Sequence, residues 1–511
     1  MDKPKKIIII GAGISGLTSG IYGQKNGFVT EIFEKNPLPG GLCFTWYRKG
    51  YPIDGCVHWL TGTKEGTELN QMWKDVDAFD KEDIIKDDNF GTIEVLNQKI
   101  TLWCDLNKLE EDLIKISPKD KRQIKRLTKL IIKIQNMKLP LDMPTSIMSI
   151  WRLMDVGIKL TPSLFSYLNT TKLTCEQYAK RFKSPVIKYI LTQIVPGHNN
   201  LYSTLFAYGT ACVGNGGVVK GGSNYIIKRM VEKYRLEGGV IHFNSEVKRL
   251  FIENGVCKGI ELSDGTIHKA DYVISALDSA YTLTSLLEGK YRDKEIEKRL
   301  AETKKYPLPS CVYTTFLVDY NAYKELGLTT TYQFQCEPFK AGASSFSLIK
   351  MRDYSYDPMF VKDGKLVMNV MTHQDDEDFL YWKKLKEDPT EYNIRKQIVA
   401  DEIKQRIIEK FPSLKDKIEL LDVATPVTYE RYCNAYHGAY MPFAFTSKAS
   451  LLMHNGKIKG VKNLFISGQW TFMPGGIPFA LSSGKFSIQR ILKQEKRHYR
   501  ITKKQYQKYA K

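Results

Sequence analysis

The stretch Lys6–Gly16, KIIIIGAGISG, decides the fold. Its four consecutive isoleucines form a short β-branched run, as expected for a parallel strand that is buried on both faces. The three glycines that follow open a helix, and a second strand is predicted at Thr30–Glu34. The sequence therefore predicts a β-α-β unit in roughly the first 40 residues.

Each glycine of this turn has a mechanical role. Gly11 allows the tight turn, Gly13 lets the backbone approach a pyrophosphate, and Gly16 lets the helix pack closely on the strand. The amino terminus of the helix would present free N–H groups to phosphates. Glu34 closes the next strand, where its carboxylate can accept hydrogen bonds from both ribose hydroxyls. This combination predicts a dinucleotide-binding site.

Composition describes an ordinary globular protein with an unusual charge. The chain has 511 residues, of which 42% are apolar and 26% charged, so disorder is excluded as its main state. Its 76 Lys and Arg against 56 Asp and Glu give a net charge of +20. Such an excess favours anionic partners, which can be nucleic acid, lipid head groups or phosphorylated ligands. No nucleic-acid-binding fold accompanies the charge, so no nucleic-acid partner is expected.

The cysteine spacing and the hydropathy of the sequence indicate the cellular compartment of the protein and whether it spans a membrane. The nine cysteines include no CxxC pair and no Cys/His cluster, which disfavours a disulfide framework and a metal site. The apolar run Ile7–Tyr22 is interrupted by glycines and is shorter than the ~20 residues of a membrane span. We expect a cytoplasmic protein without transmembrane helices, whose membrane contact is peripheral.

Two further segments carry recognisable motifs. They are Glu34-Lys35 with Gly40-Gly41-Leu42, Gly50–Gly55 and His58 near the amino terminus, and Asn463–Trp470 with Pro474–Pro478 and Ser483–Lys485 near the carboxyl terminus. These segments resemble the FAD-binding start and the closing segment of the phytoene desaturase, carotenoid isomerase and retinol saturase group. Gly221–Ser223, Val247 and Asp264-Gly265 occur between them in the order that this family shows.

The resemblance implies an α/β fold with a Rossmann-type FAD-binding domain of the glutathione reductase-like or amine oxidase-like superfamily, and an inserted α+β substrate domain. We expect a discontinuous FAD-binding domain, a largely helical lid or membrane-facing subdomain, a mixed-sheet substrate domain and a basic tail. Their predicted ranges are 1–75 with 215–300 and 450–492, then 76–214, 301–449 and 493–511.

The resemblance also implies which residues contact FAD. Gly40 and Gly41 would pass beside the pyrophosphate, the backbone of Val247 would contact adenine, and the loop after Gly468 would lie under the ribityl chain and the flavin ring. The full predicted set is Gly11, Ala12, Gly13, Ser15, Gly16, Glu34, Lys35, Gly40, Gly41, Leu42, His58, Val247, Gly468, Gly476, Ile477 and Pro478. No second GxGxxG is present, so NAD(P)H is expected only as a diffusible electron donor.

The expected function is that of an FAD-dependent oxidoreductase that desaturates, saturates or isomerises carbon-carbon double bonds of an apolar polyene or isoprenoid-like lipid, such as a carotenoid or retinoid. The alternatives are a flavin amine oxidase or ketosteroid-type dehydrogenase, and a non-catalytic prenyl-protein carrier of the GDP-dissociation-inhibitor type. Leu42 stands where amine oxidases commonly carry arginine, and the intact glycine loop argues against a carrier. No catalytic residue can be assigned. His58 is a candidate proton donor at the flavin side, with a structural role as its alternative.

Three further patterns concern the middle of the chain. Leu109–Lys138 predicts a helix with an apolar and a basic face, which either lies on an anionic membrane or packs on the domain. Leu139–Leu168 predicts short helices with an apolar face, forming a lid or an entrance. The glycine-rich segment 214–222 is interpreted as a loop.

Overall fold

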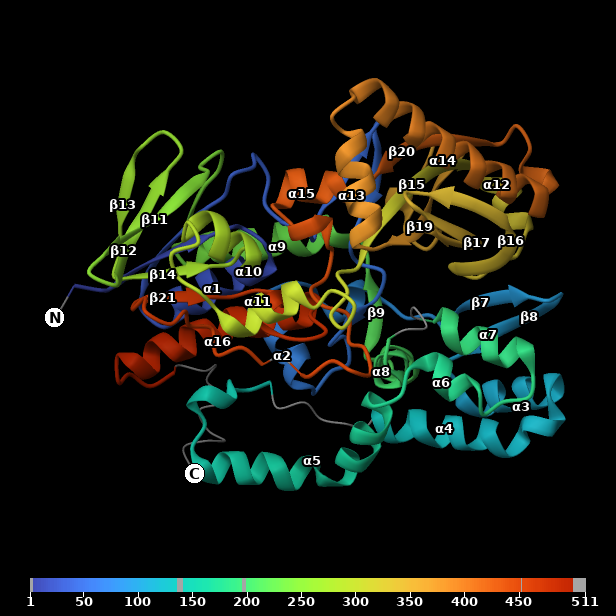
Figure 1. The fold of residues 1–511 in the computed structure, drawn as a ribbon, viewed down its shortest axis with the longest axis horizontal. Helices are drawn as coiled ribbons and strands as arrows, with labels where there is room; N and C mark the ends of the chain where they lie inside the picture. The colour runs from blue at the N-terminus through green and yellow to red at the C-terminus, as the bar shows by residue number, and fades with distance from the viewer. Residues whose placement is uncertain (1–2, 136–140, 195–198, 452, 500–511) are drawn as a thin grey trace.

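The computed structural model describes residues 3–135, 141–194, 199–451 and 453–499. It confirms the predicted β-α-β unit as part of a five-stranded parallel sheet with the order β10-β2-β1-β14-β21. Segments far apart in the chain therefore meet in one sheet (Figure 1). The elements are β1 (Lys6–Ile10), α1 (Ile14–Lys25), β2 (Val29–Phe33), β10 (Val240–His242), β14 (Tyr272–Ser275) and β21 (Leu464–Ile466).

The isoleucine run shows why this sheet lies between two layers. Ile7 and Ile9 belong to the core shared with the helices, whereas Ile8 and Ile10 belong to the core on the opposite face. Side chains alternate across a strand, so a run buried on both faces needs apolar residues at every position. The helical layer contains α1, α9 (Gly222–Leu236), α16 (Ile477–Gln494) and α2 (Glu68–Asp75). The opposite layer contains β11 (Val247–Glu253), β12 (Val256–Leu262), β13 (Ile267–Lys269), α10 (Ser279–Tyr281) and α11 (Lys294–Ala301).

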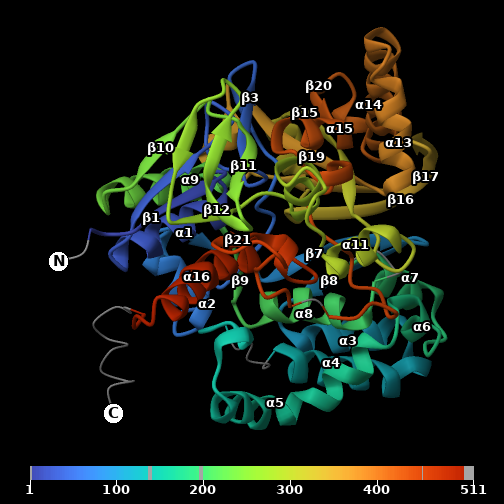
Figure 2. The same cartoon turned by 60° about the vertical axis from the view of Figure 1, so that its left-hand side comes forward.

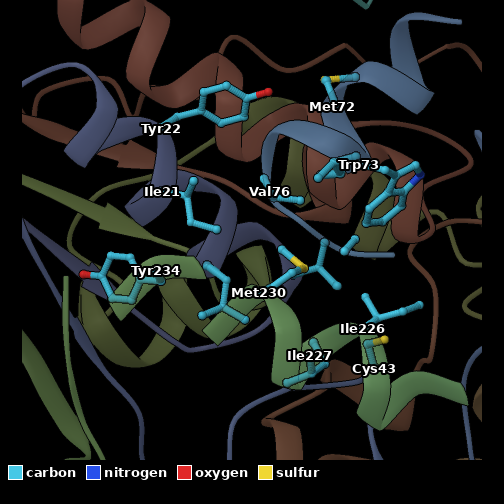
Figure 3. Close-up of a cluster of buried hydrophobic side chains, with 14 of the residues drawn as sticks. Ile21, Tyr22, Cys43, Met72, Trp73, Val76, Ile226, Ile227, Met230 and Tyr234 are labelled. Carbon is cyan, nitrogen blue, oxygen red and sulfur yellow. The ribbon is translucent and has the colours of Figure 1, made fainter. Parts of the chain in front are cut away.

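Large side chains fill the helical layer. Figure 3 shows Ile21 of α1, Met72 and Trp73 of α2, and Met230 and Tyr234 of α9 gathered in one buried cluster. Each such side chain contributes roughly 1.5–3 kcal/mol when it is fully buried. This cluster fixes α1, and with it the glycine turn at its amino terminus, against the rest of the domain.

The inserted region is built on an eight-stranded sheet with the order β20-β15-β19-β17-β16-β7-β8 and β18 paired to β19. One face is covered by helices α13 and α14 and forms a separate core. The α+β character of the insert is therefore confirmed. The strands are β7 (Asn89–Val95), β8 (Gln98–Trp103), β15 (Ser310–Asp319), β16 (Thr331–Ala341), β17 (Ser344–Asp353), β18 (Val361–Lys362), β19 (Lys365–Gln374) and β20 (Ile418–Ala424). The helices of this region are α12 (Tyr320–Glu325), α13 (Asp376–Leu385), α14 (Pro389–Lys410) and α15 (Pro426–Cys433).

The segment 76–214 is mainly helical but also supplies β7 and β8 to the large sheet. Its helices are α3 (Leu106–Ile116), α4 (Lys121–Gln135), α5 (Ile150–Thr171), α6 (Cys175–Ala179), α7 (Pro185–Gln193) and α8 (Leu201–Cys212). Figure 2 shows α5 along the lower edge of the molecule, beside α4.

Three sequence predictions in this region were wrong. The single helix expected from Leu109 is two helices, because Pro118 lies between them and cannot continue the α-helical hydrogen bonding. The expected short helices near Leu160 are one helix of 22 residues, α5. The glycine-rich loop contains a strand, β9 (Gly216–Val219), which pairs with β5 (Leu60–Thr61) and β6 (Ile84–Ile85). Residues 136–138 of the expected helix lie outside the described residues.

The basic helix α4 does not offer an apolar face to a membrane. Its residues Ile124, Leu127, Ile131 and Ile134 are buried in the core that α4 shares with α3, α7 and α8. Packing on the domain is therefore the correct alternative, and the lysines face solvent. In the described part of the chain, no helix is long and apolar enough to cross a membrane.

Candidate cofactor and substrate site

A cavity of about 970 Å³ lies between the five-stranded sheet and the eight-stranded sheet. One end is formed by the glycine turn, and other walls come from α5, α8, the uncovered face of the large sheet and the segments 429–445 and 468–480. Such concave sites with mostly apolar walls are the usual places for cofactors and small ligands. Every residue predicted to contact FAD lines this cavity except Ala12 and Gly16.

Serine hydroxyls hold the two separated sequence motifs together. The Ser15 hydroxyl is hydrogen-bonded to the Ser467 hydroxyl and lies 3.3 Å from that of Ser483. Ser483 in turn accepts a hydrogen bond of 2.8 Å from the backbone N–H of Gly468. A Cβ at Gly484 would lie 2.6 Å from the Ser15 carbonyl oxygen, so α1 and α16 can cross this closely only at a glycine. The two motifs thus form one end of one site.

The amino terminus of α1 fits a dinucleotide pyrophosphate. Its N-cap residue, Gly13, provides no side-chain cap, and the first turn contains no acidic residue. Gly13 has an ordinary φ of −78°, and a Cβ there would meet protein atoms no closer than 3.7 Å. The protein itself therefore does not require glycine at this position, whereas a pyrophosphate approaching the backbone does. By contrast, a Cβ at Gly16 would lie 1.9 Å from the Gly11 carbonyl oxygen.

Glu34 and Lys35 differ in how their side chains are hydrogen-bonded within the protein. The buried Glu34 carboxylate accepts hydrogen bonds from the backbone N–H of Ala12 at 2.8 Å and of Asn36 at 2.9 Å. Carboxylate oxygens accept more than one hydrogen bond, so Glu34 retains capacity for ribose hydroxyls. The Lys35 ammonium instead contacts the Asn434 side chain at 2.6 Å. A direct role of Lys35 toward the cofactor stays a prediction.

The remaining predicted contacts come from loops around the turn. Gly40 and Gly41 have φ values of 128° and 59°, which glycine adopts without strain, and the Gly40 N–H donates to the Ala12 carbonyl at 2.9 Å. Gly476 is the N-cap of α16, so Ile477 and Pro478 bring that helix terminus to the cavity. The rest of the predicted set follows the same wall, namely Gly11, Leu42, Val247 and Gly468.

His58 lies in the cavity wall as a neutral imidazole. Its Nε2 atom is 3.0 Å from the Tyr313 hydroxyl, which also donates to the Asp54 carbonyl at 2.9 Å. Burial, and after it the charges of Arg352 and Lys350, lower the pKa of His58 well below its usual value. At neutral pH the imidazole is therefore uncharged, and the lowered pKa makes it a weak base. A position at the flavin and a role as proton donor stay predictions for His58.

Sequence reasoning missed the polar residues on the large sheet. Lys350 and Arg352 are two positions apart on β17, so they lie on the same face, and both line the cavity. In the sheet register, Lys350 pairs with Gln333 of β16 and Arg352 with Asn369 of β19. The only local signal is the alternation of charged and apolar residues in SLIKMRD, which is also typical of a strand that faces solvent.

These cations make the sheet end of the cavity electropositive. Burial, followed by the charge of Arg352, lowers the pKa of Lys350 to about 8. Lys350 therefore carries a positive charge at neutral pH inside a cavity whose walls are otherwise largely apolar.

Among the residues that the structure describes, no group of three His, Cys, Asp or Glu is arranged to hold a metal ion.

Known proteins match the chain over nearly its full length. Residues 14–492 match the family described as flavin containing amine oxidoreductase. The chain is 23% identical to the phytoene desaturase (lycopene-forming) of Paracoccus sp., over 96% of this chain and 97% of that protein. It is 24% identical to the chloroplastic prolycopene isomerase of Arabidopsis thaliana, over 95% of this chain and 82% of that protein. A solved oxidoreductase structure from Methanosarcina mazei superposes with a TM-score of 0.61 at 17% identity, covering 95% of this chain and 100% of that one.

The family match begins at residue 14 and includes the three serines whose hydroxyls join the two motifs, and the cavity fits the cofactor that the family's name implies. The chain belongs to the flavin-containing amine oxidoreductase family and is an FAD-dependent oxidoreductase.

Proposed function

We propose that this oxidoreductase acts on carbon-carbon double bonds of a long apolar polyene or isoprenoid-like lipid, by desaturation, saturation or isomerisation. The observation that carries the proposal is the continuity of the cavity, which extends from the cofactor end to a wall of apolar and aromatic side chains on two helices. This wall is formed by Val156, Leu160, Leu164 and Tyr167 of α5, and by Tyr202 and Phe206 of α8. A long hydrocarbon gains free energy by leaving water for such a surface.

The charges in the cavity weigh against the amine alternative. Lys350 and Arg352 would repel a substrate ammonium group, and an unpaired charge is costly in a cavity with low polarity. The proteins to which the chain is similar include a phytoene desaturase and a prolycopene isomerase, whose names refer to polyenes. The non-catalytic carrier is disfavoured because the glycine turn retains its open helix terminus.

The residues of the cavity walls indicate which part of the protein performs each step of the proposed reaction. When bound, FAD supplies two-electron redox chemistry at the flavin ring. The α5 and α8 side chains hold the hydrocarbon and exclude water, and His58 lines the same cavity as a neutral imidazole. We propose the predicted division into an FAD domain (1–75, 215–300 and 450–492), a lid (76–214) and a substrate domain (301–449), with β7 and β8 tying the lid to the substrate sheet.

Anaerobic flavin titration tests the proposed reaction class. Purified protein reduced with dithionite is mixed with a panel of carotenoid precursors and retinoids, and flavin reoxidation is followed by absorbance while products are separated by chromatography. We expect at least one polyene to be reduced, desaturated in the reverse experiment, or isomerised. If only amines or steroid ketones exchange electrons with the flavin, the proposal is wrong.

We further propose that α5 attaches the protein peripherally to a membrane. Trp151, Ile158 and Phe165 are 76%, 71% and 77% exposed, and their seven-residue spacing places them on one face of the helix. Other residues of the same helix line the cavity, so a lipid could enter from the bilayer directly. A cytoplasmic location stays part of the proposal, which the nine free cysteines support.

Vesicle flotation tests the α5 attachment. We expect the protein to float with phosphatidylglycerol vesicles and to lose most of this binding when Trp151, Ile158 and Phe165 are replaced by glutamate. The matched control is Leu236→Glu, which alters a residue that is 83% exposed at the end of α9. If the control loses vesicle binding equally, or if the triple variant keeps its vesicle binding, α5 is not the membrane attachment site.

A further inference from the structure

Lys350 and Arg352 are two cavity-lining cations for which the described part of the chain provides no acidic partner. Within the described residues, neither side chain has a carboxylate oxygen within ion-pair distance. The charge of Arg352 does act on Asp87 and Asp353, where it partly offsets the rise in carboxyl pKa that burial causes. The Asp353 carboxylate is instead bonded to the Ser355 hydroxyl at 2.6 Å and to its N–H at 2.9 Å. Buried charges in proteins are normally paired, so this arrangement requires a reason.

The hydrogen-bonding groups of the two cations are also incompletely used. Arg352 donates to the Thr331 hydroxyl at 3.2 Å, and its guanidinium lies 5.8 Å from the ring centre of Tyr354. Its Nε atom is buried without a hydrogen-bond partner. For Lys350, the groups that influence its titration are its own burial and Arg352, with no anion among them. Because Nε is buried away from the cavity, the donors open to a ligand are the Lys350 ammonium and the terminal guanidinium nitrogens of Arg352.

Lys350 and Arg352 lie among other polar side chains on this face of the sheet. Gln333, Asn369 and the two cations share one face of β16, β17 and β19, whereas the alternate residues Ile349 and Met351 lie in the core on the other face. The Gln333 Oε1 and Asn369 Oδ1 atoms are buried without partners. A polar patch with unused groups is therefore set into the wall of an otherwise apolar cavity.

The cofactor phosphates do not account for the patch. The glycine turn provides for a pyrophosphate with backbone N–H groups and the α1 terminus, at a different wall formed by the five-stranded sheet. The patch belongs to the substrate sheet and lies close enough to His58 for the charges of Lys350 and Arg352 to lower the pKa of that imidazole.

We propose that Lys350 and Arg352 bind the anionic head group, a carboxylate or a phosphate, of a substrate whose long apolar chain occupies the rest of the cavity. This inference rests on the proposed function and narrows its substrate class from neutral polyenes to anionic ones. The guanidinium can bind two oxygens of such a group, and the ammonium neutralises its charge. Binding supplies the counter-ion that the protein lacks.

Equilibrium binding with matched probes tests the proposal without turnover. The probes are cis-parinaric acid, a fluorescent conjugated tetraene, and its methyl ester, which has the same chain without the charge. Geranylgeranyl monophosphate and geranylgeraniol serve as competitors, so a carboxylate site and a phosphate site are distinguished. We expect the preferred acid to bind the FAD-loaded protein at least about tenfold more tightly than its neutral counterpart.

Variants assign the preference to the two side chains. Lys350→Met and Arg352→Met are each expected to weaken binding of the acid about tenfold and to change binding of the neutral probe by less than about twofold. Arg352→Lys, which keeps the charge, should retain part of the preference. Lys340→Met on β16 is the matched control, because Lys340 is exposed and does not line the cavity.

Each outcome has a distinct meaning. If acid and neutral probe bind equally to the unaltered protein, the head-group proposal is wrong while the apolar cavity stands. If no polyene binds at all, the proposed function itself fails. If the variants leave the acid preference unchanged but shift the flavin reduction potential, the cations act on the flavin and the proposal is overturned. Flavin content and thermal unfolding of each variant show that it is folded.

Discussion

The two ends of the cavity handle negative charge in different ways. At the cofactor end, the α1 terminus has no side-chain cap, and the Lys35 ammonium is engaged by Asn434. At the substrate end, Lys350 and Arg352 supply formal charges from side chains on β17. Backbone dipoles are fixed by the fold, whereas side-chain cations can be exchanged by single substitutions without rebuilding the sheet.

This difference predicts where each end is vulnerable. The cofactor end depends on backbone approach, so an added methyl group should abolish its function. The substrate end depends on side-chain charges in surroundings of low polarity. Ligand binding there should therefore change with pH, and the charges should lower the stability of the fold. The cofactor end should therefore be intolerant of small steric changes, and the substrate end should be sensitive to electrostatic ones.

Gly13→Ala should produce the largest effect. The added Cβ would have no protein atom closer than 3.7 Å, so the protein should fold with nearly unchanged thermal stability. It would stand where the pyrophosphate approaches, and FAD occupancy should fall by at least about tenfold. Flavin absorbance of the purified protein and circular dichroism measure the two properties.

Gly16→Ala is the contrasting variant for this prediction. Its Cβ would lie 1.9 Å from the Gly11 carbonyl oxygen, so both folding and FAD binding should be lost. Full FAD occupancy in Gly13→Ala would show that the glycine turn does not hold the cofactor in the expected way.

The same two ends show what a sequence can reveal. The glycine turn and Glu34 were predictable because a strand, a turn and a helix follow one another within a short stretch, and local geometry determines what they bind. Lys350 and Arg352 were not predictable, because a charged residue on alternate strand positions faces either solvent or a cavity. Which one it faces depends on α5 and α8, which are distant in sequence.

The lid shows a second limit of the same kind. The apolar pattern of α4 was visible, but its burial depends on contacts with α8 and α5 that no local pattern contains. The exposed residues of α5, such as Trp151, were likewise expected only as part of an apolar lid. Amphipathicity identifies that a helix has an apolar face, whereas tertiary packing decides what covers that face.

A pH titration of ligand binding should produce the next largest effect. Lys350 has a pKa of about 8, so its charge is present below that pH and is lost as pH rises through it. The preference for parinaric acid over its ester should therefore fall several-fold between about pH 7 and pH 9. Of the groups that share the cavity, His58 is neutral throughout because its pKa is well below the usual value, and the pKa of Tyr313 is well above its usual value. Burial raises the pKa of Asp278 to about 7, so this carboxyl also ionises in the range, and the Lys350→Met variant separates its effect from that of Lys350.

The FAD content of the protein provides the internal comparison for this titration. Because the pyrophosphate is held by backbone groups, FAD occupancy should stay constant over the same pH range. A preference that does not change in the unaltered protein, or that falls equally in Lys350→Met, would show that Lys350 is not the titrating group.

Removal of the Lys350 charge should have the smallest of these effects. It should raise the free energy of unfolding, although it weakens binding of the acid. The unfolded chain restores the ordinary lysine pKa, so between about pH 8 and pH 10.5 it binds more protons than the folded protein. The contribution of Lys350 to stability should rise with pH across this window, because the cost of its charge disappears. Buried cysteines and tyrosines with raised pKa values make the opposite contribution, so the comparison with Lys350→Met isolates that of Lys350. Lys350→Met keeps an apolar stem of similar length and should be more stable by about 1 kcal/mol at pH 7. The advantage should shrink toward pH 10, which thermal unfolding followed by circular dichroism measures. A less stable variant at pH 7 would mean that Lys350 supports the fold, and that the charge is not retained for a ligand.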